Sequence, residues 1–357
     1  MSISIPETIK QQVRDNASIN DGRLTPELLA YIYETKLFKL FVPEELNGLG
    51  MPLPEALRVF EQASGIDGSF GWLVTIGSGG GFFSATLPPS QAKELFGVAN
   101  AVVAGSGQVS GTARRTEGGY VVNGRWKYCS GSTFASLFTA NCRIEGGEPG
   151  AGEEIRSFAF LPEQVSVIHD WNAFGLKGTD SHTIEVKDAF VPADRTFSIM
   201  SEPNYNDPIF RYPFMPFAQT SFAAVSLGIC RHFIEEAQAF AESKRREWET
   251  TRPGRTDILQ RVIGEQARLL EADAEIFYGT VERTWETFKG KGEMGEAEQA
   301  DVQNVCRTLA RNTLVYTNMI FLLLGMTALM EDHPLNRTWR DLHTVTQHSA
   351  LVPWPEQ

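Results

Sequence analysis

The spacing of hydrophobic residues changes twice along the chain. Up to about residue 95, apolar residues recur at helical intervals, as in residues 26–34, which Thr25 can cap, and in residues 53–63. From about residue 100 to 200 apolar and polar residues alternate, which is typical of strands, and from about residue 205 long helical patterns return. The sequence therefore predicts an α+β protein, mostly α, with domains at residues 1–98, 99–202 and 203–357.

The central region carries the turn signals of a small β-barrel or sandwich. Gly118-Gly119 marks one turn, and Asn123-Gly124, a dipeptide that favours a two-residue turn, predicts a hairpin within residues 120–128. Short strands separated by turns are typical of barrels and sandwiches. Further strands are expected at residues 137–143, 157–161, 165–169 and 182–186.

The C-terminal region has three long amphipathic patterns, at residues 219–246, 257–289 and 296–330. Their lengths favour an up-and-down bundle of the four-helix type. The most apolar stretch, residues 314–330, contains Tyr316, Asn318 and other polar side chains and is short for a membrane span. It is therefore predicted to be a buried helix.

Charge and cysteine content narrow the functional classes. The net charge of −12 disfavours nucleic acid or an anionic membrane as the main partner, because no surplus of basic residues exists to neutralise phosphates. The four cysteines form no C-x-x-C pair and are expected to be reduced and buried, and the polar N-terminus does not resemble a signal peptide, so a cytoplasmic protein is expected. The glycines of residues 77–81 are followed by no Lys-Ser/Thr, which disfavours a phosphate loop.

Several segments, in this order, resemble the acyl-CoA dehydrogenase superfamily across nearly the whole chain. They are the entry loop at residues 36–50, the hairpin at residues 118–131, the strand pair at residues 174–192 and Arg340-Asp341 near the end. The resemblance implies an N-terminal helical domain, a central small β-barrel and a C-terminal four-helix bundle that together bind a flavin.

Two branches of that superfamily differ in their catalytic residues. The dehydrogenases need a carboxylate base, placed after the Arg-Asp pair or early in the first bundle helix. Here no carboxylate occurs between Asp341 and Glu356, nor in residues 215–232, and His348 lies in the first of these positions. His348 and the pattern Trp126-x-x-x-Ser130-Gly131 resemble the flavin-dependent monooxygenases, in which an oxygenase component receives reduced flavin from a separate reductase.

The expected function is therefore the oxygenase component of a two-component monooxygenase that uses reduced flavin and O2 on a small aromatic or heteroatom substrate. Two alternatives stay open: an acyl-CoA dehydrogenase-like enzyme with a displaced base, and a non-catalytic flavin-binding protein used for assembly. Many hydroxylases of this branch carry a second histidine after Gly71-Trp72, where this chain has glycines, so the substrate stays open too. Lys244-Arg245-Arg246 provides basic residues without the FAD motif of the dehydrogenases, which leaves FAD or FMN, including diffusible reduced flavin, as the cofactor.

The resemblance assigns roles to particular residues. Ser130 would lie beside flavin N5, where its hydroxyl can protect the oxygen adduct of the flavin, and His348 would act as an acid or base. Alternative structural roles are a turn-capping serine for Ser130 and barrel core for Trp126. The cofactor-binding set is Trp126, Ser130, Gly131, Thr179 and Ser181, and the substrate-pocket set is Trp72, Phe82 and His348.

Assembly and metal binding complete the expectations. His343 and His348 are five residues apart, a spacing that does not place them on one helical face, so no metal site is expected. Long bundle helices that bury one face against a partner imply a homotetramer or homodimer.

Overall fold

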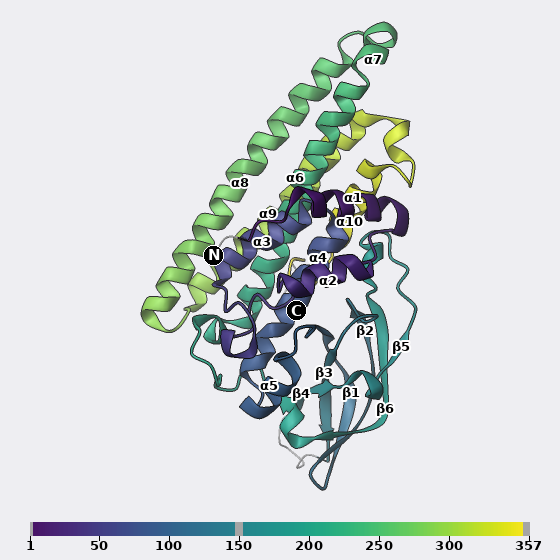
Figure 1. The fold of residues 1–357 in the computed structure, drawn as a ribbon. Coiled ribbons are helices and arrows are strands. Elements are labelled where there is room, and N and C mark those ends of the chain that lie inside the picture. Colours follow the sequence, from purple (N-terminus) through teal and green to yellow (C-terminus); the bar gives the residue numbers. More distant parts are fainter. Residues whose placement is uncertain (1–2, 147–152, 353–357) are drawn as a thin grey trace.

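The computed structural model describes residues 3–146 and 153–352, in which helices precede and follow a central group of strands. The strands lie at one end of the molecule, beneath the helices in Figure 1, and the longest helices extend away from them. This arrangement confirms the expected mostly helical α+β fold.

The N-terminal helices start where the sequence supplies a cap or a proline. Thr25 accepts the backbone N–H of Leu28, which confirms the expected N-cap, and Pro26 fills the first helical position. Asp67 caps the fourth helix in the same way by accepting the N–H of Phe70 at 2.9 Å. The five helices are α1 Glu7–Asn20, α2 Pro26–Glu34, α3 Leu53–Ser64, α4 Gly68–Gly79 and α5 Pro89–Phe96, and α4 continues into a 3-10 turn, η2 Gly80–Ala85.

Seven strands form one mixed sheet in the order β5-β6-β2-β1-β3-β4-β7, with β1 and β3 parallel and the other pairs antiparallel. The sheet is curled, as contacts between aromatic rings of β2 and β4 show: Tyr120 meets Phe158, and Trp126 meets Phe160. Strands β1 and β3 lie between β2 and β4 in the sheet order, so a flat sheet would keep these rings apart. The strands are β1 Val103–Thr116, β2 Gly119–Cys129, β3 Leu137–Glu145, β4 Ile155–Phe160, β5 Ser166–Ile168, β6 His182–Pro192 and β7 Thr196–Phe197.

The hairpin expected at Asn123-Gly124 is wrong. Strand β2 runs through this dipeptide, and the turn between β1 and β2 lies at Gly118, where φ is +74°. Gly124 pairs with Gly111 of β1, and the indole of Trp126 covers both, so that a Cβ at either position would overlap the ring. The glycine therefore serves the packing of a tryptophan and not a turn.

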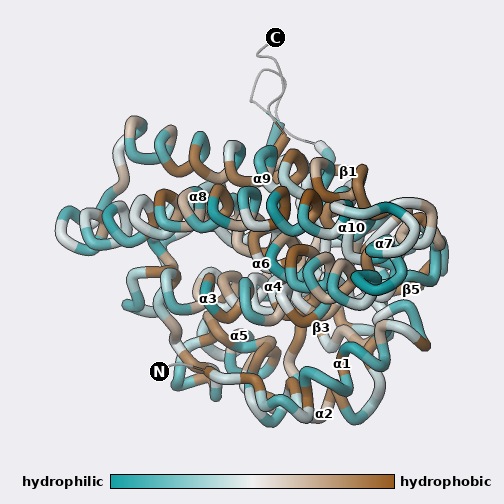
Figure 2. The backbone as a smooth tube through the Cα atoms, turned by 90° about the horizontal axis from the view of Figure 1, so that it is seen from above, coloured by the Kyte–Doolittle hydropathy of each residue, from teal (hydrophilic) through white to brown (hydrophobic). Residues whose placement is uncertain are grey.

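The C-terminal helices surround one central member. Helix α6 is buried along most of its length because α3, α8, α9 and α10 pack against it. Figure 2 shows the alternation of hydrophilic and hydrophobic positions along α8, which has solvent on one side. The helices are α6 Phe214–Ser243, α7 Arg245–Thr251, α8 Arg255–Lys291, α9 Glu296–Leu324 and α10 Pro334–Val345.

Helix α9 differs from its expected form in two respects. It ends at Leu324, because Gly325 has φ +85° and a 3-10 turn follows, whereas the pattern predicted a helix to residue 330. The expected burial of its last turns is also wrong on one face: Val315, Met319 and Leu322 are 51%, 49% and 80% exposed. Among the described residues, no helix is long and apolar enough to cross a membrane.

Candidate functional site

A chain of buried hydroxyl groups joins the helices to the sheet. The indole N–H of Trp72 on α4 donates to Ser130 Oγ at 2.9 Å, and Ser130 follows the last residue of β2. Ser130 Oγ lies 2.7 Å from Ser181 Oγ, which lies 2.7 Å from Thr179 Oγ1, and the latter donates to the carbonyl of Leu176. The structure thus brings together four of the residues expected at the site.

The hydrogen bonds of this hydroxyl chain are all donated in one direction. A hydroxyl has a single proton to donate, and that of Thr179 goes to the carbonyl of Leu176. Ser181 must therefore donate to Thr179, and Ser130 must donate to Ser181. Because Trp72 donates to Ser130, the Ser130 oxygen keeps one lone pair without a partner in the chain. Ser130 is therefore set to accept a further hydrogen bond, not to donate one.

Backbone geometry brings the two ends of the chain together. Gly131 has φ +76°, which favours glycine, and its N–H donates to the Thr179 carbonyl at 2.8 Å. Asp180, between Thr179 and Ser181, turns its carboxylate away from the hydroxyls toward Arg23 and Thr133. The Asp180 carboxylate is therefore not directed toward the hydroxyl chain.

Helix α10 fixes the segment that carries Thr179. Asp341 Oδ1 accepts the N–H of Leu176 at 2.5 Å, and Arg340 donates to the carbonyl of Phe174 at 3.0 Å. Burial, together with the charge of the neighbouring Asp67, raises the pKa of the Asp341 carboxyl to about 7. Arg340 and Asp341 therefore hold residues 174–176 in place.

His348 lies in the turns after α10, beside two aromatic rings. Its ring centroid is 4.2 Å from that of Phe222 and 5.9 Å from that of Trp72. Nδ1 accepts the backbone N–H of Ala350 at 3.2 Å, so in the neutral ring the proton is on Nε2. Burial lowers the pKa of His348 to about 4, so the ring is neutral at pH 7 and its free polar group is an N–H donor.

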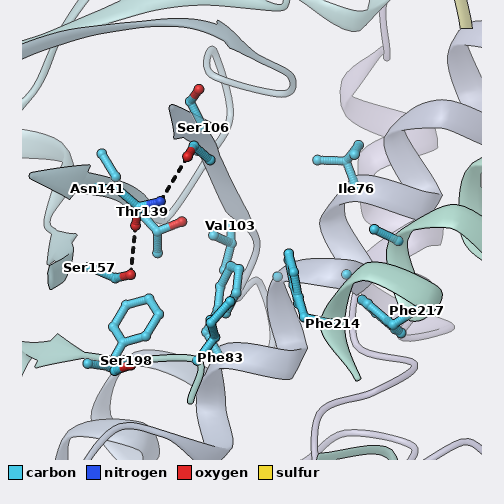
Figure 3. A pocket seen from close by; sticks show the side chains of 18 of the residues that line it. Ile76, Phe83, Val103, Ser106, Thr139, Asn141, Ser157, Ser198, Phe214 and Phe217 are labelled. Carbon is cyan, nitrogen blue, oxygen red and sulfur yellow. Dashed lines mark hydrogen bonds between the residues drawn. The ribbon is translucent and has the colours of Figure 1, made fainter. Parts of the chain in front are cut away.

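A cavity of about 410 Å³ lies between the sheet and helices α4 and α6. One wall, from β1, β3, β4 and residues 198–200, presents hydroxyl and amide groups among apolar side chains, and the opposite wall is aromatic, as Figure 3 shows. Phe222 lines the cavity and separates it from His348, because its ring contacts both His348 and Trp72. None of the lining residues, all of which lie in the described ranges, carries a carboxylate or any other charge.

None of the expected site residues is among those that line the cavity, and Trp126 and Phe82 are core residues. Trp126 is fully buried in the core of the sheet, where its indole N–H donates to the carbonyl of Asn141, so it does not line the cavity. Phe82 packs against Phe217 and other rings inside the helical core, and its neighbour Phe83 lines the cavity in its place. Glu356, the carboxylate nearest to Asp341 in the C-terminal direction, lies outside the described residues.

The aromatic wall was missed from the sequence. Phe214, Phe217 and Phe222 lie on one side of α6, and the same spacing is typical of a helix face buried in a core. A usable signal was the lack of any charged residue in residues 214–230, since a helix without a polar face must be covered on all sides.

The cavity fits the ring system of a flavin, although its uncharged lining offers no cation for a flavin phosphate. Gly79 on α4 and Gly107 on β1 both line it, and a Cβ added to either would meet no atom within 4 Å, so open space lies next to both. A flat ring system with one polar edge, such as isoalloxazine, suits a space with a polar wall opposite an aromatic one. Ser106, Thr139 and Ser198 are the side chains on the polar wall that would hold it.

The chain is similar to proteins of the acyl-CoA dehydrogenase family and to flavin-dependent monooxygenases. Residues 220–353 match the family model described as acyl-CoA dehydrogenase, C-terminal domain. The chain is 29% identical to indole-3-acetate monooxygenase of Pseudomonas putida, over 97% of this chain and 89% of that protein. It is 24% identical to the flavin-dependent monooxygenase oxygenase subunit HsaA of Mycobacterium tuberculosis, over 97% of this chain and 91% of that protein.

Solved structures share the fold. The 3-HSA hydroxylase from Rhodococcus sp. RHA1 superposes with a TM-score of 0.85 at 22% identity, covering 97% of this chain and 91% of that one. XiaF from Streptomyces sp. in complex with FADH2 and glycerol gives 0.82 at 21% identity, with coverage of 96% and 89%. TdsC from Paenibacillus sp. A11-2 with FMN and indole gives 0.75 at 20% identity, with coverage of 96% and 92%.

Proposed function

We propose that this chain is the oxygenase component of a two-component monooxygenase. The premise is that the chain has the acyl-CoA dehydrogenase fold and resembles the flavin-dependent monooxygenases of that superfamily. The reaction class inserts one oxygen atom of O2 into a small aromatic or heteroatom substrate. The second oxygen atom leaves as water, and reduced flavin, FMN or FAD, supplies the two electrons and becomes oxidised.

The observation that carries the proposal is the uncharged lining of the cavity. An acyl-CoA dehydrogenase must place a carboxylate within hydrogen-bond reach of the substrate α-proton. The lining residues of this cavity include no Asp or Glu, and the ionisable group next to its aromatic wall is His348, which lies behind Phe222. A neutral imidazole with a pKa of about 4 is a poor base for that proton, which disfavours the dehydrogenase alternative.

Ser130 supports the use of reduced flavin. Its oxygen accepts one hydrogen bond from Trp72 and has a lone pair left, while its proton goes to Ser181. Such a hydroxyl accepts an N–H, which reduced flavin has at N5 and oxidised flavin lacks. In this proposal Trp72 and Ser181 hold the Ser130 oxygen in position, and the aromatic wall excludes water from the reacting atoms.

We propose that His348 is the acid–base group of the reaction, which requires the Phe222 ring between His348 and the cavity to turn aside. The ring presents the Nε2 proton because Nδ1 is occupied by the Ala350 N–H. A neutral donor of this kind stabilises developing negative charge on oxygen and does not depend on pH near neutrality. Thr179 and Ser181 act through Ser130 and are positioning residues.

Isotope and product measurements test the function. Purified protein is mixed under nitrogen with chemically reduced FMN or FAD and an aromatic substrate, then exposed to ¹⁸O2, and the product is analysed by mass spectrometry. One ¹⁸O atom in the product, with reduced flavin consumed, is the expected result. A yellow protein whose flavin is bleached by an acyl-CoA would overturn the proposal in favour of a dehydrogenase, and binding of neither flavin state would favour the assembly protein.

Partners and location belong to the same proposal. We propose a separate flavin reductase as supplier of reduced flavin and the cytoplasm as location, the latter supported by four buried, unpaired cysteines. A homotetramer or homodimer is supported by the exposed apolar face formed by Val315, Met319 and Leu322 on α9. Light scattering after gel filtration measures the assembly directly.

A further inference from the structure

The cavity lacks any group that could pair with a charged substrate. Five phenylalanines, Phe83, Phe197, Phe214, Phe217 and Phe222, take part in its lining, and no Lys, Arg, His, Asp or Glu does so among the described residues. The sequence also has no Lys, Arg or His in residues 147–152 and 353–357, which lie outside the described ranges.

The arginines of α6, β3 and β4 have other partners. Helix α4 and η2 have no charged residue, and the first one on α6 is Arg231, which binds Glu61 and Glu271. Arg143 on β3 binds Glu153, and Arg156 on β4 binds Thr196 and Glu154. His348 behind Phe222 is neutral at pH 7, since burial lowers its pKa to about 4.

The wall formed by the helices contains hydroxyl groups, but their protons are already donated to backbone carbonyls of the same helices. Thr75 donates its proton to the carbonyl of Gly71, and Ser221 donates to the carbonyl of Phe217, so both are turned into their own helices. Asn141 on the sheet side uses its amide group on Ser157 and on the Gly107 carbonyl, as the dashed lines in Figure 3 show. Short hydroxyl groups such as Ser106 and Thr139 are what is left for polar recognition.

A buried carboxylate without a partner is strongly disfavoured, because it loses its hydration and gains no ion pair. A flat aromatic ring, in contrast, gains contact with the phenylalanine rings in stacked or edge-to-face arrangements. The cavity volume of about 410 Å³ is at the small end of the usual range for ligand sites, and a flavin ring on the polar wall takes part of it.

We infer that the substrate of this cavity is an uncharged aromatic compound of one or two rings, and that arylacetates and other aromatic carboxylates are rejected. The inference rests on the proposed function and narrows it. It also separates this chain from the similar protein whose name specifies indole-3-acetate, a carboxylate.

Indole and indole-3-acetate form a matched pair that differs by the charged arm. Equilibrium dialysis at pH 7.5, without flavin and with anaerobically reduced FMN, measures the binding of each. We expect indole to bind at least about tenfold more tightly. Equal or tighter binding of indole-3-acetate, or binding of neither compound in both conditions, would overturn the inference.

A cation placed in the wall tests the physical cause. Ile76→Arg should raise the affinity for indole-3-acetate about tenfold, whereas Ile76→Leu, the matched control, should leave the preference for indole unchanged. Ser198→Arg places the same charge in the cavity from a loop, and its affinity for indole-3-acetate is measured instead if Ile76→Arg does not fold. No gain of indole-3-acetate binding in a folded arginine variant contradicts the inference.

The two proposals fail in different ways. Incorporation of ¹⁸O into indole-3-acetate in preference to indole would leave the oxygenase function standing and overturn the uncharged substrate class. A preference for indole in dialysis together with no oxygen incorporation into any compound would overturn the oxygenase function and leave the recognition of uncharged rings intact.

Discussion

The indole N–H of Trp72 donates a buried hydrogen bond of 2.9 Å to the hydroxyl of Ser130, and this contact joins helix α4 to the end of strand β2. Both partners come from parts of the chain that fold into different layers. The orientation of the Ser130 oxygen therefore depends on how the helices dock on the sheet.

A double-mutant cycle measures this contact. Trp72→Phe removes the N–H but keeps an aromatic ring, and Ser130→Ala removes the acceptor. Each single change is expected to lower the free energy of unfolding by about 1 kcal/mol or more, with a coupling of about 1 kcal/mol between them. Urea unfolding of the four proteins gives these values, and a coupling within error of zero contradicts the described contact.

The proton direction of the hydroxyl chain makes a separate prediction. Ser181→Ala releases the proton of Ser130, which can then donate to the N5 of oxidised flavin. The ratio of the dissociation constants for oxidised and reduced FMN should fall by about tenfold relative to the unchanged protein, a shift comparable to one hydrogen bond.

Ser132→Ala is the matched control for that change, because the Ser132 hydroxyl donates to the Asp180 carbonyl and is not part of the chain. Its flavin preference should be unchanged. Anaerobic fluorescence titration measures all three proteins, and an unaltered ratio in Ser181→Ala shows that Ser130 is not set as an acceptor.

His348 is expected to affect turnover without affecting flavin binding. His348→Ala should lower the rate of product formation by about 10²-fold or more, the usual range for loss of a positioned acid–base group. His343→Ala is the control, because His343 contacts Trp339 and Asn318 and not Phe222. Equal losses in both variants, or a matching loss of flavin affinity in His348→Ala, would show a structural role only.

Asp341 makes a pH-dependent prediction. Its pKa is raised to about 7 in the native state, so native protein keeps a proton that the unfolded chain loses near pH 4. The contribution of this group to stability therefore declines as the pH rises from about 4 to about 7. Asp341→Asn keeps an acceptor for the Leu176 N–H and cannot ionise, so its stability relative to the unchanged protein should be higher at pH 8 than at pH 5.

Asp341→Ala separates the charge from the hydrogen bond. It leaves the Leu176 N–H without its acceptor and should cost about 2 kcal/mol at either pH. Urea unfolding at pH 5 and pH 8 supplies both comparisons. A stability difference between Asp341→Asn and the unchanged protein that is the same at both pH values would contradict the raised pKa.

Local patterns in the sequence were enough for most of the fold. Thr25 followed by Pro26 identifies a helix start because the cap acts within one turn. The dipeptide Asn123-Gly124 led to a wrong hairpin prediction because a turn preference depends only on adjacent residues. The glycine is present because the ring of Trp126 lies over the paired strands β1 and β2. A dipeptide propensity of this kind is outweighed by the burial of a large side chain.

The candidate site was predicted in part. The residues that were predicted belong to local motifs, whereas those that were missed depend on contacts between distant parts of the sequence. Ser130, Thr179 and Ser181 follow from motifs that resemble a known family, and the structure brings them within hydrogen-bond distance. The support of that chain by Asp341, far away in the sequence, has no local signature. The phenylalanines of α6 have the spacing of an ordinary core, and only the space that they enclose shows that they form a wall.

The three residues Gly111, Gly124 and Trp126 behave as one unit. The indole lies where two β-carbons would otherwise be, so a side chain at either glycine has no room while the tryptophan is present. Replacement of the tryptophan by a small residue would instead leave a void in the core of the sheet. A β-carbon at Gly124 would also lie 2.7 Å from the Gly111 Cα, so the backbones of β1 and β2 approach too closely there for a side chain even if the tryptophan is replaced. The close approach of the two strands, and not the indole alone, therefore keeps position 124 a glycine.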